Sequence, residues 1–131
     1  MGRYTLELEN DDEFVVIGIS CHEKDYRLCW RLNKEFKMGL ERCELQEKNQ
    51  EVLSAYSFFQ EDDQIIYTLI QNRNEEGWLL PEHRQVDYFL TLDDPHHYPV
   101  NELLENLRGL NNILAAYELN LGESKEKLRL T

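Results

Sequence analysis

The sequence has few basic residues and no long apolar run. Its 14 Lys and Arg side chains stand against 26 Asp and Glu side chains, which gives a formal net charge of −12. Because nucleic-acid affinity comes largely from basic side chains that neutralise phosphates, this charge argues against a nucleic-acid partner. It also disfavours anionic membrane surfaces. No apolar run approaches the ~18 residues that a membrane helix needs, so we expect no membrane partner.

Cysteine is also scarce. Cys21, Cys29 and Cys43 cannot all pair within one chain, and none belongs to a C-x-x-C motif, so neither a zinc knuckle nor a redox-active pair is indicated. A sparse, odd set of cysteines is typical of reduced thiols in a cytoplasm. The first residues lack the apolar segment of a secretory signal peptide. The sequence therefore predicts a cytoplasmic protein.

The length and composition fit one globular domain. The chain has 131 residues, of which 41% are hydrophobic and 11% aromatic. A domain of this length forms one core without help from disulfides or metal ions. We expect a single domain over residues 1–121 and a polar, frayed C-terminal tail over residues 122–131.

The N-terminal half predicts two strands and then a helix. Residues 4–9 alternate between apolar and polar, which is typical of a half-buried strand. Residues 14–19 are rich in β-branched side chains and favour a buried strand, although the two aspartates before them would also suit the start of a short helix. Residues 24–36 predict an amphipathic helix that starts near Ser20 or His22 and is capped by Gly39. Its expected apolar face comprises Tyr26, Leu28, Cys29, Trp30, Leu32 and Phe36.

The remaining sequence predicts a strand meander and a closing strand–helix–strand unit. The expected strands are residues 42–46, 52–60, 64–72, 86–92 and 113–119. Residues 52–72 read as a hairpin around an acidic turn at 61–63. Residues 100–110 have helical apolar spacing, with Pro99 at the start and Gly109 near the end. The predicted fold class is α+β, a single domain with a mostly antiparallel sheet and two main helices.

The most distinctive stretch is Leu80-Pro81-Glu82-His83-Arg84-Gln85-Val86-Asp87-Tyr88. It resembles the signature of a family of small bacterial proteins named for its motif, IPExxxVDY. Leu80 replaces the isoleucine of the motif, and Pro81, Glu82, Val86, Asp87 and Tyr88 match it. Segments 17–19 and 25–30 also resemble the family pattern, so the resemblance covers nearly the whole chain. It implies a family label, but no activity, ligand or cofactor.

The matching residues have a structural and a functional interpretation. In the structural one, which we prefer, Pro81 starts a turn, Asp87 accepts hydrogen bonds from loop N–H groups, and Tyr88 packs with its hydroxyl bonded. In the functional one, Glu82 and Asp87 form a carboxylate pair for acid–base chemistry. A third interpretation makes the loop a recognition surface.

Other candidate sites are weaker. Cys21 and His22 are neighbours and would point to opposite faces of a strand, and Cys29 is expected in the core. His96 and His97 lack the helical spacing that aims two histidines at one metal ion. Trp30, Trp78 and the seven tyrosines are expected in the core or an interface. The sequence has no Gly-rich phosphate loop, H-E-x-x-H or G-x-S-x-G motif.

These observations favour a non-catalytic protein–protein interaction or assembly module without a cofactor. Its partner would be an unidentified protein or a second copy in a homodimer, using the sheet face or edge that the helices leave open. One alternative is a small-ligand-sensing regulatory domain, since the closing strand–helix–strand is similar to ferredoxin-like domains such as ACT. An enzyme that uses Glu82, His83 and Asp87 is the least favoured.

Overall fold

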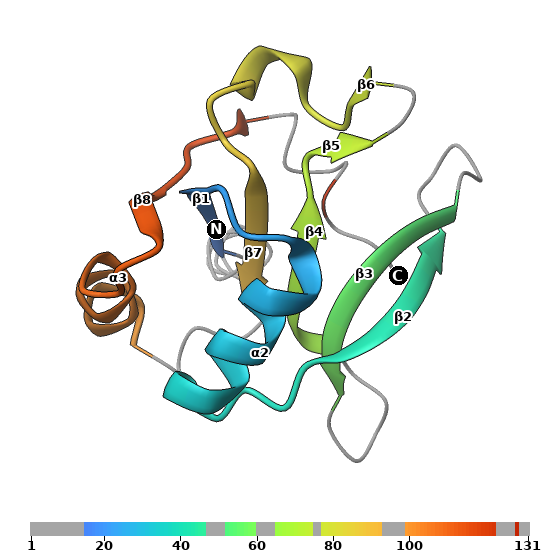
Figure 1. Ribbon diagram of the computed structural model, residues 1–131. Helices are drawn as coiled ribbons and strands as arrows, with labels where there is room; N and C mark the ends of the chain where they lie inside the picture. Colours follow the sequence, from blue (N-terminus) through green and yellow to red (C-terminus); the bar gives the residue numbers. More distant parts are fainter. Residues whose placement is uncertain are drawn as a thin grey trace, which may run out of the picture.

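The computed structural model describes residues 15–46, 52–59, 65–74, 77–92, 99–122 and 128. Within these ranges, six strands form one antiparallel sheet in the order β2-β3-β4-β7-β1-β8, accompanied by two helices (Figure 1). The sheet strands are β1 (Val15–Cys21), β2 (Glu41–Gln46), β3 (Val52–Phe59), β4 (Ile65–Gln71), β7 (Tyr88–Leu92) and β8 (Ile113–Glu118). The helices are α2 (Asp25–Phe36) and α3 (Val100–Arg108), and a short ladder, β5 (Arg73–Asn74) with β6 (Gly77–Trp78), precedes the 3-10 turn η1 (Pro81–His83). The strand predicted at 4–9, the turn at 61–63, and His96 and His97 lie outside the described residues.

The predicted fold class is confirmed. Strand β1 pairs antiparallel with both β7 and β8, so β7 and β8 run parallel with β1 between them, and α3 connects them. Strands β1 and β4 are likewise parallel on either side of β7, and α2 lies in their connection together with the β2–β3 hairpin. The order β8-β1-β7-β4 is therefore that of the split β-α-β arrangement of ferredoxin-like domains.

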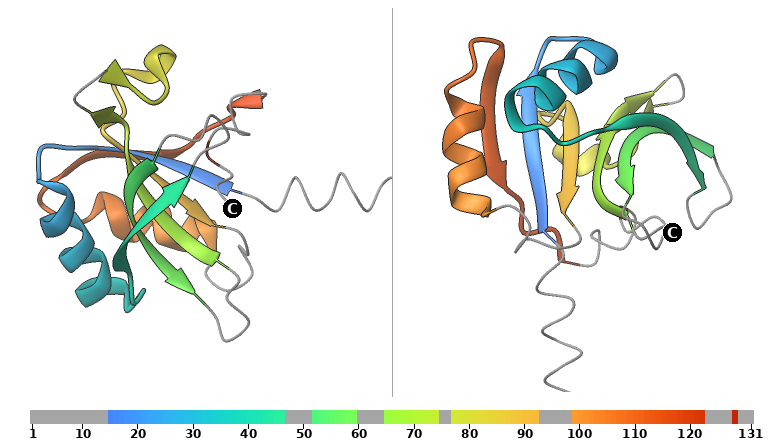
Figure 2. Two further views of the ribbon diagram at one scale, coloured as in Figure 1. Left: turned by 90° about the vertical axis from the view of Figure 1, so that its right-hand side faces the viewer. Right: turned by 90° about the horizontal axis from the view of Figure 1, so that it is seen from below.

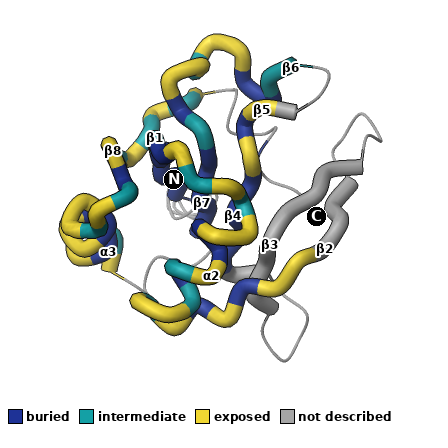
Figure 3. The backbone as a smooth tube through the Cα atoms, viewed as in Figure 1, coloured by how far each residue is buried: buried dark blue, intermediate teal, exposed yellow. Residues whose placement is uncertain are grey.

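Strand β1 is the centre of two apolar clusters, one on each face of the sheet. All its residues except Ser20 are buried, which explains why the segment is a continuous apolar run and not an alternating one. Ile17 and Ile19 join the first cluster, and Val16 joins the second. Figure 3 shows buried residues along β1 and β7. The strand preferred for this segment is thus confirmed from Val15 onward, and Phe14 lies outside the described residues.

Both helices cover the first face of the sheet (Figure 2). They contribute Leu28, Cys29 and Leu32 from α2, and Leu103, Leu104 and Leu107 from α3. Helix α3 begins after Pro99 and ends at Gly109, as predicted. Neither helix in the described part of the chain has the length and apolar character to span a membrane.

The second face of the sheet is also covered, in part by the segment between β6 and β7. Leu79, Leu80 and Val86 pack there on Phe89. Leu128 joins them with 2% of its surface exposed, so a frayed tail from residue 122 onward is wrong at this residue. Apolar burial holds Leu128, and the predicted open sheet face is closed over this second cluster.

The bounds of α2 agree with the predicted range 24–36 to within one residue, but the caps differ. The helix starts after Lys24, whereas Ser20 is a strand residue of β1 and His22 lies three residues before Asp25. It ends at Lys37, which takes the left-handed conformation (φ 56°) and donates its N–H to Asn33 O. Gly39 has a positive φ of 72° but lies two residues beyond this cap. The chain therefore turns before it reaches the glycine.

The predicted apolar face of α2 is too wide. Tyr26 and Trp30 are 58% and 60% exposed. At about 100° per residue, both lie more than roughly 100° around the helix axis from Leu32, which faces the sheet. The sheet covers only one side of α2, so these two aromatic side chains stay outside the core.

Strand β8 departs from simple alternation. The register shifts opposite Ser20 and Cys21, so Leu114 is an extra residue and is 63% exposed. This bulge moves Ile113 into the first cluster, while Tyr117 packs against the second. The closing strand is confirmed, but its residues do not share one face.

Candidate functional site

The motif loop, residues 79–88, connects β6 to β7 and carries the residues that resemble the family signature. Val86 is buried in the second cluster and Tyr88 in the first. Pro81 and Glu82 lie on η1 and are exposed, and Asp87 is half-buried just before β7. The loop thus crosses from one face of the sheet to the other.

Asn72 organises this loop, and sequence reasoning missed it. Its side chain is fully buried, with 0% exposure. Asn72 Nδ2 donates to His83 O and Val86 O, each at 2.9 Å, and Asn72 Oδ1 accepts from Leu80 N at 2.9 Å. Its backbone N–H donates to Asp87 O at 2.9 Å and its carbonyl accepts from Leu79 N at 2.6 Å. One buried amide therefore holds both ends of the loop.

Asp87 and Tyr88 join the loop to the chain that leads into α2. Asp87 Oδ2 accepts the backbone N–H of Cys21 at 2.8 Å, and Asp87 N donates to Ile19 O at 2.9 Å. The hydroxyl of Tyr88 donates to Glu23 O at 2.5 Å. The structural interpretation expected donors within the loop, whereas the donor to the Asp87 carboxylate comes from the end of β1. The motif thus fixes the segment between β1 and α2.

The two motif carboxylates lie in different surroundings. Asp87 is bonded to the backbone of β1, and Glu82 is exposed on η1. The hydrogen bond from Cys21 N to the Asp87 carboxylate links the end of β1 to the residue just before β7. This arrangement favours the structural interpretation over an acid–base pair.

We expect Asp87→Ala to lower the free energy of unfolding by about 1–3 kcal/mol, because the Cys21 N–H would lose its acceptor. Asp87→Asn, which keeps an acceptor oxygen, should lose less. Urea denaturation measures both, with Glu105→Ala, at an exposed side chain of α3, as the control. An unfolding midpoint equal to that of the parent for Asp87→Ala would rule out this structural role.

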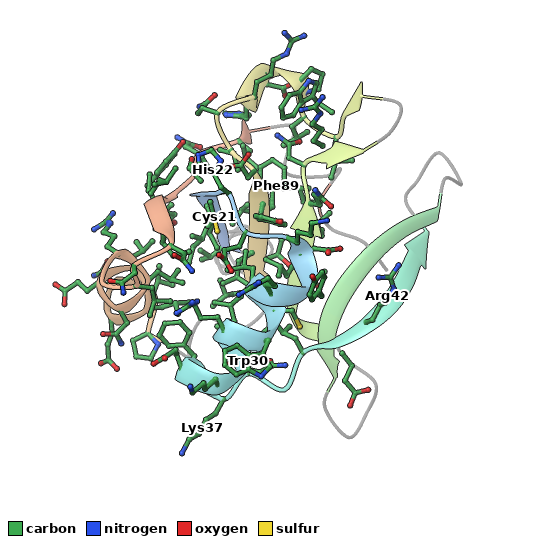
Figure 4. The ribbon with its side chains drawn as sticks, in the orientation of Figure 1. Cys21, His22, Trp30, Lys37, Arg42 and Phe89 are labelled. Atoms are coloured by element: carbon green, nitrogen blue, oxygen red, sulfur yellow. The ribbon has the colours of Figure 1, made fainter. Side chains whose placement is uncertain are left out.

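The thiols of Cys21 and Cys29 are both free and buried. Burial raises the pKa of Cys21, opposed by the hydrogen bond from Glu23 N to its sulfur. Burial and then the charge of Asp25 raise the pKa of Cys29 to about 11, opposed by a hydrogen bond from Asn33. Figure 4 labels Cys21 next to His22, which is exposed. These protonated thiols are poor nucleophiles at neutral pH.

We predict slow alkylation of Cys29 by iodoacetamide at neutral pH. A pKa of about 11, against the ordinary 9.0, lowers the thiolate fraction and hence the rate roughly hundredfold relative to the unfolded chain. The folded state binds this proton more tightly than the unfolded state, so stability should fall as pH rises from 9.0 toward about 11. Peptide mass spectrometry after timed labelling measures the rate. Equal rates for folded and urea-unfolded protein would contradict the prediction.

A pocket lies on the outer side of α2. Its volume is about 380 Å³, and its lining residues are Glu23, Tyr26, Arg27, Trp30 and Arg31. We call it the α2 pocket. Figure 4 labels Trp30 on α2. Lys34 Nζ stands 4.9 Å from the centroid of the Trp30 ring, a cation–π distance.

Two of the charged side chains in the α2 pocket, Glu23 and Arg27, form an ion pair, and the third, Arg31, does not share in it. Arg27 Nε lies 3.4 Å from Glu23 Oε1, and Asn112 Nδ2 donates to Glu23 Oε2 at 2.9 Å. Arg31 Nε, by contrast, is buried without a hydrogen-bond partner among the described residues. The pocket therefore combines exposed aromatic surface with an unsatisfied cationic donor.

Among the described residues, no group of three or more His, Cys, Asp and Glu side chains is placed to hold a metal ion. Of the site residues predicted from sequence, Val86 and Tyr88 are buried, Asp87 is half-buried, and Pro81 and Glu82 are exposed. The resemblance to the IPExxxVDY family rests on these motif residues and stays a prediction. Comparisons with protein-family models, with curated proteins and with solved structures gave no match.

Proposed function

We propose that this protein is a non-catalytic protein-interaction module and that the exposed side of α2 is its contact surface. The observation that carries the proposal is the pair Tyr26 and Trp30, more than half exposed and one helical turn apart. In the described part of the chain they are two of the three exposed large hydrophobic side chains, with Leu114 the third. Tyrosine and tryptophan are enriched at protein interfaces because they combine large apolar area with a polar group.

The position of α2 supports this role. Leu28 and Leu32 anchor the helix on the sheet with 0% exposure. Asn33 clamps the following turn, because its Nδ2 donates to Leu40 O at 3.0 Å and its Oδ1 accepts from Leu40 N at 2.7 Å. A surface held in place before binding loses little conformational entropy when a partner docks.

The motif loop holds the chain segment that leads into α2, and so helps to position the same surface. Tyr88 bonds to the carbonyl of Glu23, which lines the α2 pocket, and Asp87 bonds to Cys21 two residues earlier. In this proposal the motif is a positioning element, and α2 makes the contact. The motif loop then has a structural role and takes no part in a chemical reaction.

Site-specific photocrosslinking tests the proposal. A benzophenone side chain at position 26 should yield a discrete adduct in cells, whereas one at Asn101, exposed on α3, should not. Trp30→Ala should abolish the adduct, since buried interface tryptophans contribute about 2 kcal/mol or more, while leaving the unfolding midpoint unchanged. Equal crosslinking from both positions, or an adduct insensitive to Trp30→Ala, would rule out α2 as the surface.

The proposal includes a cytoplasmic setting and a partner that is another protein or a second copy. The free thiols Cys21 and Cys29 support the setting, since unpaired cysteines are typical of reducing compartments. Light scattering after size exclusion distinguishes a homodimer from a monomer, and a monomer would indicate that the partner is a different protein.

Ligand sensing is the second candidate, favoured by the strand order β8-β1-β7-β4 that ferredoxin-like regulatory domains share. A metabolite that binds the folded state would raise the melting temperature. A thermal-shift screen with purified protein therefore separates this candidate from the interaction module.

A further inference from the structure

The side chain of Arg31 gives the α2 pocket a chemical preference. Its Nε is buried and lacks a hydrogen-bond partner among the described residues, although it belongs to a permanently charged guanidinium. A buried donor without an acceptor is unfavourable, and more so when it is charged. Arg31 also lines the α2 pocket, so a negatively charged group in the pocket would meet a guanidinium whose charge no acidic side chain of the described residues pairs.

The one acidic lining residue of the pocket, Glu23, is paired with other side chains. Its oxygens contact Arg27 at 3.4 Å and Asn112 at 2.9 Å. Arg27 is 64% exposed in its side chain, so its guanidinium remains open to a further anion. The pocket thus presents two arginines one helical turn apart.

The charge of this segment is opposite to that of the chain. Residues 23–37 carry five basic side chains and three acidic ones, whereas the remaining sequence carries nine basic and 23 acidic ones. A short anionic group would be attracted to this local positive region. An extended polyanion such as a nucleic acid would also meet the repulsion of the acidic surroundings.

We propose that the α2 pocket binds an acidic segment of a partner protein, with a carboxylate at Arg31 and Arg27 and an apolar side chain against Tyr26 and Trp30. This inference rests on the proposed function and names the chemistry of the partner. A symmetric dimer through the same face would set this basic surface against itself, which like-charge repulsion disfavours. The occupant is therefore a segment of a different protein.

Selection from a phage-displayed library of random peptides tests the inference. Full-length protein is the bait, and phage that also bind the Trp30→Ala variant are discarded. Enriched sequences should contain Asp or Glu next to an aromatic or aliphatic residue. Their synthetic, fluorescein-labelled copies should bind more weakly as NaCl rises from about 50 to about 500 mM, because salt screens the arginines.

Arginine variants then assign the carboxylate contact. Arg31→Met should weaken binding of the enriched peptide roughly tenfold to hundredfold, since it removes one side of a desolvated charge pair. Arg27→Met should weaken peptide binding to a smaller extent. The side chain of Arg27 is 64% exposed and tolerates substitution, so this variant still tests the contact if Arg31→Met unfolds. The matched control Arg84→Met, at an exposed arginine on the motif loop, should stay within about twofold.

The outcomes separate the inference from the proposed function. Trp30-dependent peptides without acidic residues, or with affinities insensitive to salt and to both arginine variants, would overturn the inference and leave α2 as the contact surface. Failure to enrich any Trp30-dependent sequence would count against both. Binding of a labelled oligothymidylate that Arg31→Met abolishes would also overturn the inference, because the ligand would then be a phosphate.

Discussion

Asn72→Ala should lower the free energy of unfolding by about 3–5 kcal/mol, among the largest effects of any single change in this protein. The substitution leaves the N–H of Leu80 and the carbonyl of Val86 without their partner, whereas the carbonyl of His83 keeps the N–H of Val86. Each such buried group costs about 1–3 kcal/mol, although water can reach part of the loop and relieve some of the loss. Urea denaturation followed by tryptophan fluorescence measures the change.

A matched control isolates the buried network. Asn101 is an exposed asparagine on α3, so Asn101→Ala should change stability by less than about 0.5 kcal/mol. Because the motif loop holds the segment before α2, Asn72→Ala should also make that segment exchange its amide hydrogens faster. If Asn72→Ala and Asn101→Ala unfold at the same denaturant concentration, the amide does not organise the loop.

Phe89→Ala should cost about 3–5 kcal/mol, because it removes a large side chain with 0% exposure and leaves a cavity. Phe89 lies in the second cluster, where the motif loop packs on the sheet. Leu114→Ala, at the bulge of β8 and 63% exposed, is the apolar control and should change stability by less than about 0.5 kcal/mol. Similar losses for the two variants would mean that the second face of the sheet is not a core.

Local sequence pattern predicts well the elements that carry one clear signal, either a single apolar stripe or a composition typical of strands. Helix α3 has one apolar stripe and sequence signals at both ends, Pro99 and Gly109, so both its type and its limits could be predicted. The two neighbouring strands β3 and β4 followed from their β-branched and aromatic composition. In α3 the apolar period shows directly which side faces the core, since Leu103, Leu104 and Leu107 are all buried.

The sequence predictions fail where contacts between distant segments determine which side chains are buried. On α2, an aromatic side chain has the same apolar signal whether it faces the sheet or solvent, so the pattern places Tyr26 and Trp30 on the apolar face although both are exposed. In β8, the bulge at Leu114 interrupts alternation, and local sequence carries no mark of a bulge set by the pairing with β1.

The site was harder to predict than the fold. The motif residues were found because they are locally distinctive, but their partners are far away in sequence, such as Cys21 for Asp87. Asn72 stands at the end of a predicted strand and looks like an ordinary turn residue, since asparagine is common in turns. Its three side-chain bonds reach residues eight to 14 positions later, a relation that only the folded chain reveals.

The central place of β1 has a consequence for the order of folding. Its partners are β7, which ends at Leu92, and β8, which ends at Glu118, so the earliest described strand pairs with segments that are synthesised much later. Pairings between such distant segments close large loops and slow folding. On the ribosome, β1 should remain without its two neighbouring strands until β7 and β8 have emerged, whereas the β3–β4 hairpin can close as soon as it is synthesised.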